Sequence, residues 1–188
     1  SSTSRGLGDV YKRQDILNAI GNTPIVKLKN IVPIGCGDIY VKLEAFNPTG
    51  SKKDRMALSM ILGAEKRGVL KKGMTVVEYS GGSTGAGLAF VCSLKGYNFR
   101  LVTADVFGKE KIDLMRSLGA NLEIIKSTDG KINKELITKM IKKADQISKE
   151  PNTFFTNQLD NFDVIEGFIP LGEEILYQLN GKVDAVCD

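Results

Sequence analysis

The chain has 188 residues, of which 42% are hydrophobic, and its formal net charge is +4, figures that suit one ordinary domain or the larger part of a two-layer enzyme with a sizeable core. It contains no apolar run of about 18 residues and no signal-peptide pattern, so we expect a soluble, cytoplasmic protein with no membrane partner. Three widely spaced cysteines argue against a disulfide framework or a metal site, and the absence of histidine excludes histidine acid–base chemistry.

Residues 1–14 are set apart from the fold. The stretch "SRGLGDVYKRQ" (4–14) resembles the translated read-through of a transposase-type sequencing adapter, which implies that Asp15 is not a true start and that the gene product is incomplete. This segment holds three basic residues and one acidic residue, so the remaining chain has a net charge of +2 rather than +4. No basic patch is left, and we expect no nucleic-acid partner.

From Asp15 onward, short β-rich runs alternate with segments of helical period, a pattern typical of a parallel α/β sheet. The predicted strands are 24–28, 38–44, 75–80, 99–104, 121–126, 153–157 and 183–188. The predicted helices are 53–67, 84–95, 109–118, 132–149 and 162–179. A glycine follows each of the first three helices, as expected for C-terminal caps, and Pro170 predicts a kink or break in the last helix.

The stretch "EYSGGSTGAGLAF" (78–90) leads from a buried strand through two glycines into a helix. Backbone N–H groups at a helix start are unpaired and lie at the positive end of the helix dipole, so the place suits a carboxylate or a phosphate. The alternative is a purely structural turn with Ser83 or Thr84 as the helix cap. The loop matches neither the dinucleotide-binding nor the phosphate-loop glycine pattern.

The stretch "PTGSKKDRMALS" (48–59) sets Lys52 and Lys53 at a predicted helix start. A helix N-terminus disfavours a cation, and burial adds to this, so a lysine in the first turn should have a lowered pKa and be a better nucleophile. Such a lysine could form a Schiff base with a carbonyl substrate or with pyridoxal phosphate. The competing interpretation is a solvated helix end, and local physics does not choose between the two lysines.

Several motifs occur together in one order: "IGNTPIVKL" (20–28), "KLEAFNPTGSKKDR" (42–55), "EYSGGSTGAGLA" (78–89) and "LGANLEII" (118–125). In this order and spacing they resemble the cysteine synthase and cystathionine β-synthase family of fold-type II pyridoxal-phosphate enzymes, over nearly all of residues 15–188. The resemblance implies pyridoxal 5'-phosphate as cofactor. It also implies that Lys53, rather than Lys52, is the catalytic Schiff-base lysine and the base that moves the substrate α-proton.

The resemblance implies roles for the glycine loop as well. Ser83 would contact the ring oxygen of the cofactor, and the substrate carboxylate would be bound by Ser80, Gly81, Gly82 and Thr84. Gly81 replaces the family's usual serine and Ser83 its usual asparagine, so cofactor tuning and the choice of substrate stay open. Further along, "TNQLDN" places Gln158 where a side-chain amide contacts the substrate carboxylate, against the alternative of a surface or capping role.

The fold implied by the resemblance is a three-layer, parallel-sheet architecture of the tryptophan synthase β type, truncated at the C-terminus. Residues 15–45 would begin the large domain, 46–157 would form the small N-terminal α/β domain, and 158–188 would begin the large cofactor-binding domain. The loop for the cofactor phosphate and the residue facing the pyridine nitrogen would follow Asp188. We therefore expect the chain as it stands to be inactive. The resemblance also implies that the full-length protein is a homodimer.

The activity implied is a β-replacement on a small amino-acid substrate. An activated serine, such as O-acetylserine, loses its β-substituent, and sulfide adds to the aminoacrylate on the cofactor to give cysteine. One alternative keeps the cofactor but performs β-elimination or deamination of serine or threonine, or forms cystathionine. Another is a catalytically inactive ligand-binding paralogue, against which the intact Lys53 argues.

Overall fold

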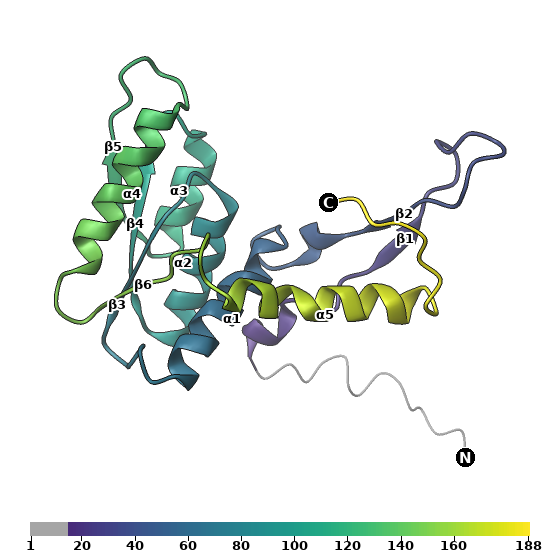
Figure 1. Ribbon diagram of the computed structural model, residues 1–188, viewed down its shortest axis with the longest axis horizontal. Coiled ribbons are helices and arrows are strands. Elements are labelled where there is room, and N and C mark those ends of the chain that lie inside the picture. The colour runs from purple at the N-terminus through teal and green to yellow at the C-terminus, as the bar shows by residue number, and fades with distance from the viewer. Residues whose placement is uncertain (1–14) are drawn as a thin grey trace.

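A four-stranded parallel sheet forms the centre of the molecule's wider part in this computed structural model, which describes residues 15–188 (Figure 1). The adapter-like residues 1–14 lie outside the described residues. The strand order is β5-β4-β3-β6, and the strands are β3 (Thr75–Tyr79), β4 (Asn98–Ala104), β5 (Asn121–Ile125) and β6 (Thr153–Phe155). Helices connect them, which is why neighbouring strands run parallel.

Helices cover both faces of this sheet. Those between the strands are α2 (Ser83–Lys95), α3 (Lys109–Ser117) and α4 (Lys134–Ser148), and α1 (Lys53–Lys66) precedes β3. Successive strand residues face opposite sides, so Val76 packs in the cluster with α1 and α2 while Val77 packs in the cluster with α4. The three-layer α/β architecture predicted from the sequence is confirmed.

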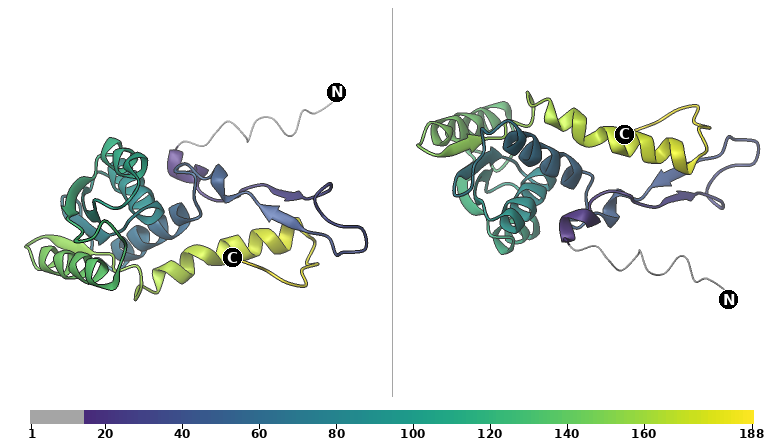
Figure 2. Two further views of the ribbon diagram at one scale, coloured as in Figure 1. Left: turned by 90° about the horizontal axis from the view of Figure 1, so that it is seen from above. Right: turned by 90° about the horizontal axis from the view of Figure 1, so that it is seen from below.

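A narrow arm extends from this body and consists of a two-stranded sheet with a helix lying along it (Figures 1 and 2). The elements are β1 (Ile25–Lys27), β2 (Tyr40–Lys42) and α5 (Asp163–Gln178), with short 3-10 helices at Ile16–Ala19 and Glu44–Phe46. The alternating pattern from Asp15 onward predicted a parallel sheet, and this was wrong for β1 and β2, which pair antiparallel. A loop without a helix connects them, and such a connection suits an antiparallel pair.

Two further expectations were wrong. Residues 183–188 form no strand; within residues 15–188, no strand runs beside them to pair with their backbone groups. Of the kink or break predicted at Pro170, the break is wrong, because helix α5 continues through the proline. Contacts on both sides of the proline hold the helix, since Gly167 lies against the backbone of α1 and Glu174 forms ion pairs with Lys42 and Arg55.

Among residues 15–188, no helix is long and apolar enough to cross a membrane.

Candidate active site

The glycine loop lies at the carboxyl edge of the parallel sheet, between the end of β3 at Tyr79 and the start of α2 at Ser83. The hydroxyl oxygen of Ser80 accepts hydrogen bonds from the backbone N–H groups of Gly82 (3.1 Å) and Gly85 (3.2 Å). The interpretation of Ser83 or Thr84 as the helix cap is therefore wrong, because both lie inside the first turn and Ser80 satisfies the helix start instead.

The start of α2 also carries hydrogen-bond donors that have no acceptor within residues 15–188. Over residues 15–188, the backbone N–H groups of Ser83 and Thr84 donate to no acceptor, and neither hydroxyl forms a hydrogen bond. Ser83 is exposed, whereas Thr84 is buried. Two free N–H groups at the positive end of a helix, flanked by two hydroxyls, form an arrangement that binds a carboxylate or another anionic oxygen.

The two lysines of the other motif differ in their surroundings. Lys52 forms an ion pair with Asp188. The Lys53 amine forms no hydrogen bond or ion pair with any residue in the range 15–188, and its nitrogen lies 5.7 Å from the ring centroid of Phe168 in α5. Burial, with the charge of Lys52 in addition, lowers the pKa of Lys53, while Asp188 opposes this shift. The structure thus separates two lysines that local sequence physics left equivalent.

The start of α1 is held by short-range hydrogen bonds. The hydroxyl oxygen of Ser51 accepts from the backbone N–H of Lys53 at 3.2 Å. The buried carboxylate of Asp54 accepts from the backbone N–H of Thr49 at 2.7 Å and also from the Thr49 hydroxyl. These contacts fix the turn before the helix, so the backbone that carries Lys53 has little freedom.

Gln158 lies next to the glycine loop. Its side-chain amide donates to the carbonyl oxygen of Tyr79 (3.1 Å), directly before Ser80, and its backbone N–H donates to the carboxylate of Glu78 (2.9 Å). One edge of the sheet therefore brings together the candidate substrate-binding residues, which are Ser80, Gly81, Gly82, Thr84 and Gln158, and the candidate cofactor contact Ser83.

Glu78 lies beside the candidate site and was not among the residues predicted from the sequence. It is fully buried in β3, and its carboxylate accepts from the Tyr79 N–H (2.8 Å), the Thr156 hydroxyl (2.8 Å) and the Gln158 N–H. Burial raises the pKa of Glu78 to about 7, against the effect of these hydrogen bonds. The signal was present in "TVVEYS", where one acid interrupts an otherwise apolar strand.

The sequence analysis also did not predict a cluster of ion pairs between α1 and the arm. The Arg55 guanidinium donates to Glu44 of the 3-10 helix (2.7 and 2.8 Å) and to Glu174 of α5 (2.7 and 2.8 Å), and Lys42 of β2 also pairs with Glu174 (2.7 Å). Burial opposes the shift, but the hydrogen bonds from Arg55 and Lys42 lower the pKa of Glu174 to about 2. This cluster ties the first turn of α1 to the arm.

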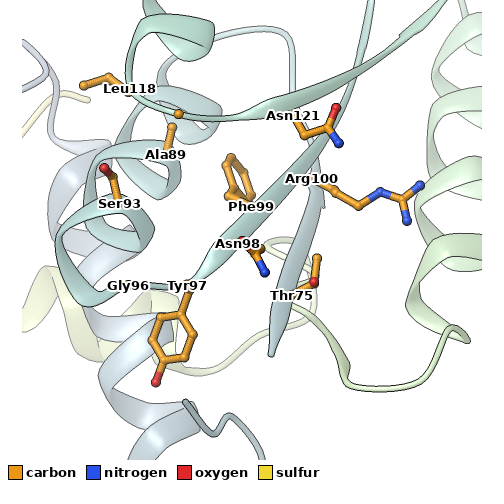
Figure 3. Close-up of a pocket in the computed structure, with 11 residues that line it drawn as sticks. Thr75, Ala89, Ser93, Gly96, Tyr97, Asn98, Phe99, Arg100, Leu118 and Asn121 are labelled. Atoms are coloured by element: carbon orange, nitrogen blue, oxygen red, sulfur yellow. The ribbon is translucent and has the colours of Figure 1, made fainter. Parts of the chain in front are cut away.

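A cavity of about 510 Å³ lies at the opposite, amino edge of the sheet (Figure 3). Thr75, Asn98 and Asn121, the first residues of β3, β4 and β5, all line it. Because the glycine loop follows the last residue of β3, this cavity is not part of the candidate site.

The chain is similar to known proteins over most of its length. A family model described as "pyridoxal-phosphate dependent enzyme" matches residues 16–187. A cysteine synthase from Staphylococcus aureus is 42% identical over 175 residues, which are 91% of this chain and 54% of the relative. An O-ureido-L-serine synthase from Streptomyces lavendulae is 40% identical over 146 residues, or 78% of this chain and 43% of the relative.

Solved structures are similar as well. A hydrogen sulfide-producing enzyme from Fusobacterium nucleatum superimposes with a TM-score of 0.82 at 38% identity, over 90% of this chain and 54% of that one. The chain therefore spans about half the length of the curated relatives it matches.

Proposed function

Because the chain belongs to the pyridoxal-phosphate-dependent enzyme family, we propose that the full-length protein performs a β-replacement on an activated serine such as O-acetylserine, with sulfide as nucleophile and cysteine as product. The observation that carries this proposal is the Lys53 amine, which is partly buried, has a lowered pKa and forms no ion pair with any of residues 15–188. A relative named cysteine synthase supports the choice of product.

The described residues fit pyridoxal phosphate. A lysine amine whose charged form is disfavoured is suited to hold an aldehyde cofactor covalently, and Lys53 is the candidate for that role. Ser83, exposed at the start of α2, would hold the ring oxygen of the cofactor. When bound, the cofactor supplies an electron sink for the carbanion formed at the substrate Cα.

The substrate carboxylate would lie against the start of α2. The free N–H groups of Ser83 and Thr84 and the Thr84 hydroxyl are its donors, and the amide of Gln158 lies at the same edge of the sheet. With the carboxylate fixed there, the Lys53 nitrogen serves as the base that removes the Cα proton, a task for which a lowered pKa is favourable.

We further infer the domain arrangement that the sequence predicted, in which 46–157 is a small α/β domain and 15–45 and 158–188 belong to a large one. The arm supports this, since β1, β2 and α5 come from the two outer segments and lie together, apart from the sheet of the body (Figure 2).

Two observations bear on which nucleophile is used. Gly81 brings no hydroxyl to the loop, and one relative is named an O-ureido-L-serine synthase. The alternatives are β-elimination or deamination of serine or threonine, cystathionine formation, and a paralogue without catalysis.

The test is a substrate panel on the full-length protein with cofactor. O-acetylserine, O-phosphoserine, serine and threonine are each supplied with and without sulfide, and cysteine and keto acids are measured. We expect cysteine from O-acetylserine with sulfide. Keto acid as the main product, whether or not sulfide is present, would favour elimination, and no product from any donor would favour the inactive paralogue.

A further inference from the structure

The ring of Phe107 occupies the space that a side chain at Gly81 would need. A Cβ placed on Gly81 would lie 2.1 Å from Cε1, 2.4 Å from Cζ and 2.5 Å from Cδ1 of the Phe107 ring. Real Cβ atoms do not approach carbon this closely, and a ring is not the flexible end of a side chain. The present position of Phe107 is therefore compatible only with glycine at position 81.

Packing against a buried cluster holds the Phe107 side chain in place. Phe107 is partly buried in the turn between β4 and α3, and it packs on the buried cluster between the sheet and α4, which includes Val77, Tyr79 and Val102. Moving the ring away from Gly81 would break this packing. A larger residue at position 81 therefore has no low-cost solution.

The same part of the chain flanks the next glycine. A Cβ on Gly82 would lie 3.4 Å from Cδ and from Nζ of Lys111 in the first turn of α3. The segment from Phe107 to Lys111 thus forms one side of the loop, with the aromatic ring at Gly81 and the lysine at Gly82. No residue of this segment was among the predicted site residues.

Resting on the proposed function, we propose that Phe107 is a specificity-determining residue: its ring takes the place of a side chain at position 81 and forms an apolar wall beside the bound amino-acid substrate. Where the family pattern carries a serine side chain, the space beside Gly81 is filled by the ring of Phe107 from the turn between β4 and α3. The substrate carboxylate is then held by the start of α2 and the Thr84 hydroxyl, and the wall limits the size of the β-substituent.

The first experiment is a double-mutant cycle on the full-length protein without cofactor, read as the thermal unfolding midpoint. Gly81→Ser alone should lower the midpoint by several degrees because its Cβ overlaps the ring. Phe107→Ala should remove the overlap, so that adding Gly81→Ser to Phe107→Ala costs nothing further. In the control, Phe155→Ala, which removes another ring of the same cluster, should leave the cost of Gly81→Ser unchanged.

The second experiment measures donor choice with cofactor and sulfide. O-acetylserine is compared with the larger, uncharged O-butanoylserine. Phe107→Ala should raise the ratio of kcat/KM for the larger donor to that for O-acetylserine by roughly tenfold, about the effect of one or two methylene groups in a pocket. Phe107→Leu, which keeps an apolar wall, should shift the ratio less. This measurement does not depend on whether Gly81→Ser folds.

The outcomes separate the two proposals. If Gly81→Ser costs the same in both backgrounds, or Phe107→Ala leaves the donor ratio unchanged while cysteine is still formed, the inference on Phe107 is wrong and the proposed function stands. If no donor gives product, the proposed function fails, and the unfolding cycle still decides whether Gly81 and Phe107 exclude each other.

Discussion

The backbone carbonyl oxygen of Lys53 lies so close to Gly87 that a Cβ at position 87 would come within 3.1 Å of it. The same Cβ would lie 3.1 Å from the Asp54 carboxylate and 3.2 Å from the Cβ of Ala57. Gly87, one turn into α2, therefore sets the distance between α2 and the first turn of α1. The starts of these two helices carry the proposed cofactor lysine and the proposed anion site.

Gly87→Val should lower the free energy of unfolding by about 2 kcal/mol, because overpacking two helices in contact typically costs ~1–3 kcal/mol. Urea denaturation of the full-length protein measures this. Gly172→Ala is the matched control, since a Cβ at that position in α5 meets nothing within 4 Å. The control should be stabilising by up to about 1 kcal/mol. Equal stability of the Gly87 variant and the wild type would contradict close packing here.

The Arg55 cluster makes a second prediction. Arg55→Met leaves Glu44 and Glu174 without their main partner, and losing one member of a buried pair costs roughly 3–5 kcal/mol. Lys139→Met, which breaks an exposed i,i+4 pair with Glu135, should cost about 0.5 kcal/mol or less. Denaturation midpoints of the two variants that lie close together would show that the cluster does not join the arm to the body.

Glu78 predicts a specific pH dependence of stability. Its pKa rises from 4.5 in the unfolded chain to about 7 in the folded one, so the folded state binds more protons between these values. The stability contributed by protonated Glu78 is therefore complete below pH 4.5 and is lost as the pH rises through 7, by on the order of 3 kcal/mol. Glu78→Gln should flatten this slope, measured by denaturation at several pH values. An unchanged slope would mean that Glu78 is charged in the folded state across this range.

Substitutions of Ser80 and Ser83 should have different effects, the first on the stability of the fold and the second on cofactor binding. Ser80→Ala removes the acceptor for two N–H groups at the start of α2 and should cost about 1 kcal/mol of stability. Ser83→Ala removes no hydrogen bond found among residues 15–188, and its unfolding free energy should change by less than about 0.5 kcal/mol. With cofactor bound, only Ser83→Ala should keep full stability while shifting the absorption of the cofactor. A reversed order of the two stabilities would contradict the assignment of Ser80 as cap.

The sequence predicted the body of the fold well because its signals are local. Strands such as Thr75–Tyr79 are short apolar runs, and the helices after them end at glycines such as Gly96, which adopts the left-handed conformation at the end of α2. The arm was predicted less well. The antiparallel pairing of β1 with β2 follows from the loop that joins them, which the alternating pattern of the rest of the chain does not predict. The continuity of α5 through Pro170 is supported by contacts between residues more than a hundred positions apart, such as Lys42 with Glu174.

In the candidate site, too, the sequence revealed the residues with a local pattern and not those that depend on contacts in three dimensions. The motifs pointed to Lys53 and the loop Ser80–Thr84 as candidates, but not to the residues packed around them. Glu78 was hidden in a strand, and Phe107 lies in a turn whose sequence has no special pattern. Only its approach to Gly81 in three dimensions reveals it.

The most direct test of the account is the identity of the lysine that carries the cofactor. The full-length protein is incubated with pyridoxal phosphate and reduced with borohydride, and the modified peptide is mapped for the wild type, Lys53→Ala and Lys52→Ala. We predict cofactor on Lys53 in the wild type and in Lys52→Ala, and none on the Lys53→Ala protein. Cofactor fixed on Lys52, or full activity in Lys53→Ala, would contradict the central claim.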